Sequence, residues 1–201
     1  KLVFGIINYS NWIKIFIYTS YTMNILVYGS KGWIGTQFCD VLLNENIQHT
    51  KGKSRCGDYA GLEKEILEVK PTHIISFIGR THGTIGDKKY TTIDYLEQEG
   101  KLTENIRDNL YSPVLLCSIA KKHDIHYTYL GTGCIFKYDD AHPFEKEENG
   151  FTEDAVPNFF GSGYSIVKGF TDKLIHDMYD DSTLNLRIRM PITGEHNGRN
   201  F

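Results

Sequence analysis

The sequence has 201 residues, and its 22 Lys and Arg against 25 Asp and Glu give a formal net charge of −3. This length predicts one α/β domain, or one domain with part of a second, and a content of 40% hydrophobic and 23% charged residues excludes a disordered chain. The charge balance and apolar runs of only four residues, such as 25–28, exclude bulk-charge nucleic-acid binding and a bilayer span of about 20 residues, so we expect neither nucleic-acid nor membrane partners.

Residues 1–22 differ in composition from the rest of the chain, because they are rich in Ile, Tyr and Asn and carry only Lys1 and Lys14 as charges. We interpret them as an N-terminal extension of unknown role; an extra edge strand or a targeting segment is the alternative. Residues 23–201 form the main predicted domain. The chain stops soon after a turn-rich stretch without a closing helix, so we expect the domain to be cut short at its C-terminus.

Apolar runs alternate with helical periods along this domain. Strands are predicted at 24–28, at a stretch ending near residue 50, and at 73–78, 126–130 and 184–189. Helices are predicted from Trp33, from Leu62 to a stop at Pro71, over 103–123 with a break near Pro113, and over 164–179. The alternation predicts an α/β fold, with a doubly wound parallel sheet covered on both faces.

A glycine loop follows the first predicted strand directly. Gly29, Gly32 and Gly35 are three residues apart and lead into a helix. The first glycine allows a tight turn, the second lets a pyrophosphate approach the backbone at the helix N-terminus, and the third permits close helix-to-strand packing. The pattern therefore predicts a Rossmann-type dinucleotide site, which includes the neighbouring Lys31, Trp33 and Ile34; a glycine turn without a ligand is the alternative.

The residues after the second predicted strand indicate which dinucleotide binds. An NAD enzyme usually places a carboxylate there for the ribose 2′-hydroxyl, but Thr50 to Arg55 contain three cations and no acid. Arg55 and Lys53 suit a 2′-phosphate, so we expect NADP(H) in preference to NAD, with Asp58 near the adenine. A solvated basic loop is the alternative.

A candidate reaction centre lies in the second half of the chain. Tyr164 and Lys168 are four residues apart, hence on one helix face, and an adjacent ammonium lowers the pKa of a phenol. Thr132 ends a predicted strand, where its hydroxyl can bind a carbonyl oxygen. Together these residues predict a reductase; an exposed Tyr-Lys pair is the alternative.

At these positions the chain resembles the extended short-chain dehydrogenase/reductases, and among them the UDP-4-keto-6-deoxyglucose 3,5-epimerase/4-reductases of plant-type and viral UDP-L-rhamnose synthesis. Beside the glycine loop and Tyr164 to Lys168, the more specific motifs are 52–55, 70–73, Thr132 to Phe136, 157–159, 187–192 and Arg199-Asn200-Phe201. The resemblance covers residues 23–201, the NADP-binding domain.

The resemblance implies that NADPH reduces the C4 ketone of a UDP-linked 4-keto-6-deoxy sugar after epimerisation at C3 and C5. In this interpretation Tyr164 is the proton donor, Lys168 binds the nicotinamide ribose and Thr132 orients the carbonyl. Cys134 is implied as the acid-base residue of epimerisation, on the same face as Thr132 if that segment is extended; a small buried hydrophobe is the alternative. The lysine that would complete the epimerase pair is expected a few residues past Phe201.

Weaker signals complete the predicted site. Gly79 and Arg80 are expected at the adenine ribose, Asn109 in a structural role, and Asn158, Arg189 and Pro191 at the sugar.

The four cysteines, at positions 39, 56, 117 and 134, show no C-x-x-C spacing. Their spacing favours reduced thiols in the cytoplasm and predicts no metal site.

Two other functions stay open. The first is a non-catalytic NADP-binding regulatory subunit of the rhamnose-reductase-like type. The second is a dTDP-4-dehydrorhamnose reductase without epimerase activity, although Cys134 stands where that subgroup is expected to have aspartate. The sequence is compatible with a homodimer and with UDP or dTDP on the sugar.

Overall fold

The computed structural model describes residues 23–144 and 149–194. The expected extension 1–22 and the motif that ends at Phe201 lie outside the described residues.

Five strands form one parallel sheet in the order β2-β1-β3-β6-β7. Their bounds are β1 Ile25–Tyr28, β2 His49–Lys51, β3 His73–Ser76, β6 His126–Thr132 and β7 Thr183–Ile188. The chain runs from β1 to one side and then crosses to β3 on the other, which is the 2-1-3-4-5 order of doubly wound folds. The point where the direction reverses, between β1 and β3, is where such folds bind ligands. The predicted parallel sheet is confirmed.

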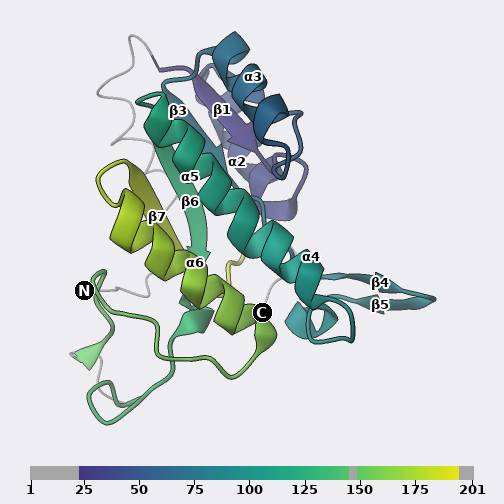
Figure 1. Cartoon of the computed structure of the whole chain (residues 1–201), viewed down its shortest axis with the longest axis vertical. Coiled ribbons are helices and arrows are strands. Elements are labelled where there is room, and N and C mark those ends of the chain that lie inside the picture. The colour runs from purple at the N-terminus through teal and green to yellow at the C-terminus, as the bar shows by residue number, and fades with distance from the viewer. Residues whose placement is uncertain (1–22, 145–148, 195–201) are drawn as a thin grey trace.

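Helices cover both faces of this sheet, as predicted. On one face, α2 (Trp33–Asn44) packs over a cluster that includes Ile25, Val27 and Ile75. The other face carries α3 (Tyr59–Val69), α5 (Ser112–Lys122) and α6 (Gly163–Tyr179), and Figure 1 shows α5 and α6 lying side by side across the strands. Within the part of the chain that the structure describes, no helix is long and apolar enough to cross a membrane.

The predicted helix 103–123 is interrupted near Pro113, as expected, in the turn that precedes this residue. α4 (Leu102–Ile106) passes into a π-helical turn, η2 (Arg107–Tyr111), and then into α5. The wider turn lets the Ser112 N–H reach the Arg107 carbonyl. It also leaves the Asn109 carbonyl to accept from Thr171 Oγ1 at 2.7 Å. Pro113 has no N–H and a fixed φ, so it fits the first turn of α5 without disturbing it.

A hairpin that the sequence analysis does not predict follows β3. Its strands are β4 (Gly83–Ile85) and β5 (Lys88–Tyr90), and it projects from the body of the protein beside α4 (Figure 1). Its base packs on Tyr95, because a Cβ at Gly83 would lie 2.4 Å from that ring. Tyr95 belongs to the short helix η1 (Ile93–Tyr95), so the hairpin and η1 form one unit next to the carboxyl ends of the strands.

Candidate active site

The glycine loop lies at the switch point of the sheet. Gly29 follows β1 with φ +73, and a Cβ there would lie 2.8 Å from the backbone of Phe77, just after β3. A Cβ on Gly35 would lie 2.2 Å from the Gly29 carbonyl oxygen, so the helix can sit this close only with glycine at position 35. The roles predicted for these two glycines match their geometry.

The N-terminus of α2 lies at this switch point, directly after the glycine loop. Gly32 is the N-cap residue, no side chain caps the helix, and its first turn contains no acid. Lys31 is exposed, and Trp33 and Ile34 are half-buried in the first turn. A helix N-terminus with free donors and a positive dipole end attracts an anion. The loop therefore fits a pyrophosphate.

The backbone of the basic loop after β2 is held by one carboxylate. Glu65 accepts from the backbone N–H groups of Lys53 at 2.7 Å and Ser54 at 2.9 Å, and from the Tyr28 hydroxyl at 3.0 Å. Burial alone would raise the pKa of Glu65, but these hydrogen bonds outweigh it and hold the pKa below its usual range. The side chains of Lys53 and Arg55 remain exposed, so the loop presents two cations on a fixed backbone.

Asp58, expected near the adenine, has a structural role. Its carboxylate is the N-cap of α3 and accepts from the Gly61 N–H at 3.1 Å. This interaction fixes the start of the helix that also carries Glu65. Contact with an adenine stays a prediction.

The loop at Gly79 and Arg80 is fixed by Asn109, which is 1% exposed. Its side chain accepts from the Arg80 N–H at 2.8 Å and donates to the Arg80 carbonyl at 2.9 Å. It also donates to Asn105 at 2.9 Å. A Cβ at Gly79 would lie 3.1 Å from Asn109 Oδ1, so the side chain needs the glycine beside it. The structural role predicted for Asn109 has this physical basis.

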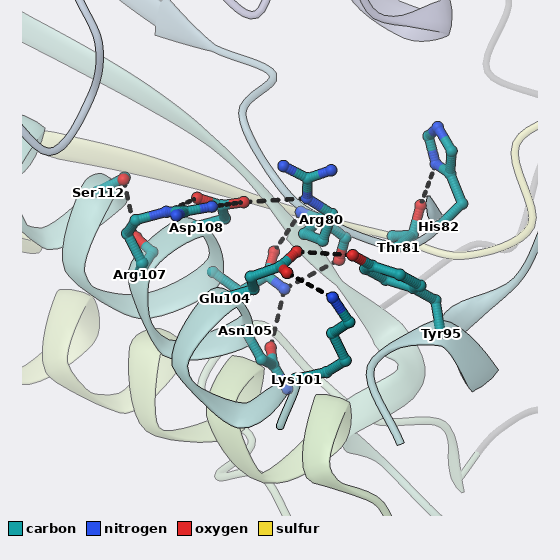
Figure 2. A network of polar contacts seen from close by, with 11 residues as sticks. Arg80, Thr81, His82, Tyr95, Lys101, Glu104, Asn105, Arg107, Asp108 and Ser112 are labelled. Carbon is teal, nitrogen blue, oxygen red and sulfur yellow. Dashed lines mark hydrogen bonds and ion pairs between the residues drawn. The ribbon is translucent and has the colours of Figure 1, made fainter. Parts of the chain in front are cut away.

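Figure 2 shows the polar network around this loop. Arg80 Nε donates to Asp108 at 3.0 Å, and the two terminal nitrogens of Arg80 point away from the network, on the side of the His82 ring. Glu104 accepts from Tyr95 at 2.8 Å and Lys101 at 2.7 Å. These two hydrogen bonds hold the pKa of Glu104 below its usual range, and the bond from Lys101 has the larger effect. The network therefore fixes Arg80 while part of its guanidinium faces outward.

Thr132 and Cys134 come together in a way that differs from the expectation. The strand β6 ends at Thr132, and the next residues form the 3-10 turn η3 (Gly133–Ile135), so the segment is not extended. Thr132 Oγ1 accepts from the Cys134 N–H at 3.2 Å. The turn places Cys134 against a cluster that includes Tyr95 and Tyr164, so the expected proximity holds although its assumed geometry is wrong.

Tyr164 lies in the first turn of α6 and is 7% exposed. Glu97 accepts from the N–H groups of Gly163 at 2.9 Å and Tyr164 at 3.0 Å, and thus fixes the start of the helix. Burial raises the pKa of Tyr164 to about 12; the charge of a Cys134 thiolate acts in the same direction, and a hydrogen bond with Thr132 opposes it. The expected lowering by Lys168 is not found.

Lys168 is 5% exposed and bonds to β6 rather than to Tyr164. Its Nζ donates to the Tyr129 hydroxyl and, at 3.2 Å, to the Leu130 carbonyl. Burial lowers its pKa to about 7, although Asp172 and Cys134 favour the charged form. The buried amine of Lys168 thus has two oxygen acceptors on β6. The phenol of Tyr164 stays protonated at neutral pH. The two residues share the helix face as predicted, but not a direct bond.

Asn158 and Arg189, two of the three residues expected at the sugar, lie beside η3. Asn158 fastens the segment after η3, since it accepts from the Lys137 N–H at 2.9 Å and donates to the Lys137 carbonyl at 3.0 Å and to Asp139 at 2.9 Å. A Cβ at Gly133 would lie 3.3 Å from Arg189 Cβ, so Arg189 adjoins the turn. Arg189 is exposed and Pro191 is half-buried. The amide of Asn158 is thus occupied within the protein.

Sequence reasoning missed three residues that position this site. Glu65 holds the basic loop, Glu97 holds the start of α6, and Tyr129 binds Lys168. A carboxylate that binds backbone N–H groups of a distant segment leaves no local pattern. The alternation of Tyr127 and Tyr129 in an apolar strand does indicate that both face the core, but not that one hydroxyl meets an amine.

Comparison with known proteins adds to this geometry. No protein-family model matches the sequence. The chain is 54% identical to a protein of Acanthamoeba polyphaga mimivirus whose crystal structure is described as a UDP-rhamnose synthase, with a TM-score of 0.81, over 89% of this chain and 60% of that one.

A plant enzyme is the second relative. The chain is 35% identical over 90% of its length to an Arabidopsis thaliana trifunctional UDP-glucose 4,6-dehydratase/UDP-4-keto-6-deoxy-D-glucose 3,5-epimerase/UDP-4-keto-L-rhamnose-reductase, of which it covers 25%. The chain is thus similar in sequence to two proteins that are described as enzymes of rhamnose synthesis. It spans about 60% of the length of the mimivirus relative.

A more distant structure supports the fold. A Bacillus anthracis dTDP-4-dehydrorhamnose reductase in complex with NADP has a TM-score of 0.68 at 16% identity, over 88% of this chain and 56% of that one. The shared architecture is the Rossmann-type parallel sheet with flanking helices, as expected from the glycine loop.

Proposed function

We propose that this chain, as the NADP-binding domain 23–201, takes part in reducing the C4 ketone of a UDP-linked 4-keto-6-deoxy sugar, with 3,5-epimerisation, to form UDP-L-rhamnose. The gathering of Thr132, Cys134 and Tyr164 at the carboxyl end of β6 is the observation that carries the proposal. The similarity to enzymes of rhamnose synthesis supports it.

The cofactor proposal rests on the fit between the crevice and NADPH. The cradle of Gly29 and Gly35 with the open end of α2 suits a pyrophosphate, and Lys53 with Arg55 suits a 2′-phosphate. When bound, NADPH supplies a hydride to the carbonyl carbon. Arg80 and Lys168 are proposed at the two ribose groups.

Each protein group then has one task in the reduction. Tyr164 donates its hydroxyl proton to the oxygen that becomes the alcohol, and its raised pKa keeps that proton in place at neutral pH. Thr132, which shares a hydrogen bond with Tyr164, orients the carbonyl. The Cys134 thiol moves a proton at C3 or C5, where the adjacent ketone makes the proton acidic.

The deciding experiment follows NADPH absorbance with UDP-4-keto-6-deoxyglucose as substrate. A chain extended past Phe201, where the second residue of the epimerase pair is expected, should oxidise NADPH, whether or not residues 1–201 alone do so. In that extended chain Tyr164→Phe should lose at least about 100-fold in rate, the usual contribution of a general acid, and still bind NADPH. Cys134→Ala should stop solvent deuterium from entering C3 and C5 and spare the reduction of a substrate already in the L-configuration. NADPH binding without oxidation in every protein would favour the regulatory subunit instead.

The proposed setting is a homodimer in the cytoplasm. Exposed apolar side chains gather on α4 and α6, which adjoin each other: Leu102, Ile106, Ile166 and Phe170. Such a patch is typical of a protein interface, and a molar mass of twice the chain in light scattering is expected.

A further inference from the structure

The buried amine of Lys168 is held by the strand that ends at the reaction centre. Both oxygen atoms that accept from Nζ belong to β6, namely the Tyr129 hydroxyl and the Leu130 carbonyl. Nζ also lies 4.4 Å from the centre of the Tyr129 ring. Tyr129 is 1% exposed, so water does not compete for this contact.

Among the described residues, the other ionisable groups near Lys168 form no hydrogen bond with its amine. From α6, Tyr164 keeps its proton, and Asp172 is bound by Arg187 through two bonds of 2.8 and 2.7 Å and by Asn185 at 2.8 Å. Cys134 approaches from η3, and Cys117 of α5 lies near Tyr129. Among the described residues, the Tyr129 hydroxyl is therefore the side-chain acceptor that the amine uses.

We propose that Tyr129 is a positioning residue of the reduction site: its hydroxyl holds the Lys168 amine at the carboxyl end of β6 and favours the charged form of that amine. An oxygen acceptor and an aromatic face both interact more strongly with an ammonium than with a neutral amine. Burial opposes the charge and lowers the pKa of Lys168 to about 7, whereas Asp172 and Cys134 favour the charged form. The contact with Tyr129 acts in the same direction as these two charges. The expected effect on turnover rests on the proposed function, in which Lys168 binds the cofactor ribose. The contact between Tyr129 and Lys168 is independent of that function.

Tyr127 provides a matched control. It lies two residues earlier on β6, on the same face of the strand, and is 0% exposed. Replacing either tyrosine by phenylalanine removes one hydroxyl from the same buried layer. Only the Tyr129 hydroxyl bonds to Lys168.

The test is a titration of lysine side chains labelled with ¹³C at Cε, followed by NMR, in the wild-type protein and in the two variants. The Lys168 signal is assigned by its loss in Lys168→Met. In Tyr129→Phe its midpoint is expected to fall by about one pH unit, the size expected for losing a hydrogen bond to a charged group. In Tyr127→Phe it should stay unchanged. An unchanged midpoint in Tyr129→Phe, or equal changes in both variants, would overturn the proposal.

Two further measurements keep this result separate from the proposed function. In the wild-type protein, a nuclear Overhauser contact between Lys168 Hε and the Tyr129 ring is expected, and its absence refutes the proposal even if Tyr129→Phe does not fold. In assays of NADPH oxidation, Tyr129→Phe should move the high-pH limb of activity to lower pH by the same amount. If no protein reduces the sugar, the proposed function fails while the titration still decides the role of Tyr129.

Discussion

The exposed cations Lys53 and Arg55 stand on a backbone that Glu65 fixes from α3. Their placement can thus discriminate between cofactors without any movement of the loop. Changing both to alanine is expected to weaken NADPH binding by about 10- to 100-fold, because one or two charge-assisted hydrogen bonds to the 2′-phosphate are lost. NADH, which lacks this phosphate, should bind almost as before.

The dissociation constants of both cofactors, measured by calorimetry, check this expectation. Lys64→Ala is the matched control, since Lys64 is exposed on α3 and its ion pair within 23–144 and 149–194 is with Glu68, across 3.9 Å. Equal losses for NADPH and NADH would mean that the basic loop does not read the 2′-phosphate.

At the scale of elements, the start of α6 is held both by its N-cap residue Ser162, which accepts from the Ser165 N–H at 3.1 Å, and by a residue from another segment. Glu97 satisfies two N–H groups of the turn that carries Tyr164. Glu97→Ala is expected to lower the free energy of unfolding by about 1 kcal/mol, as for the loss of a helix cap. It should also lower kcat more than it raises KM, because the turn that carries the proposed acid loosens.

Thermal unfolding and steady-state kinetics of Glu97→Ala measure the two expected losses. Glu99→Ala is the control, because Glu99 is an exposed acid two residues away. Glu97→Gln keeps an oxygen acceptor and should recover part of both losses. If Glu97→Ala behaves like Glu99→Ala, the cap does not position Tyr164.

The elements themselves were largely predictable from the sequence, because strands and helices longer than a few residues leave a clear apolar period. The break near Pro113 was predictable, because this residue has no N–H to offer the Asn109 carbonyl four residues earlier. Its π-helical form at 107–111 was not, since Thr171 of the distant α6 donates to that carbonyl instead. The hairpin of β4 and β5 was not either, because its short polar strands depend on packing of Gly83 against Tyr95. In the site, the residues on motifs were predictable, whereas their partners Glu97 and Tyr129 come from distant segments.

At the scale of the whole molecule, two histidines make the sheet sensitive to acid. His73 and His126 are paired across β3 and β6, with ring centres 5.3 Å apart. Loss of water lowers the pKa of both, and the charge of His126 further lowers that of His73. The unfolded chain therefore takes up protons first, near its ordinary pKa of about 6.5.

These two histidines should therefore leave the free energy of unfolding at its full value above pH 6.5. Below that pH the free energy of unfolding should fall, by at most about 1.4 kcal/mol per pH unit for each histidine. Urea unfolding between pH 5 and 8 measures this slope. His126→Gln should flatten it, whereas His176→Gln, on the exposed side of α6, serves as the control. A slope that His126→Gln leaves unchanged would assign the acid sensitivity to other groups.

The two helix ends near the carboxyl edge of the sheet differ in one respect: that of α2 carries no carboxylate, whereas that of α6 is filled by Glu97. A phosphate is attracted to the first and repelled from the second. The carboxyl edge of the sheet is thus electrostatically polar, because it attracts anionic groups at the start of α2 and repels them at the start of α6. This difference favours a dinucleotide bound with its phosphates toward α2, and in the proposed reaction its nicotinamide end then lies nearest Tyr164.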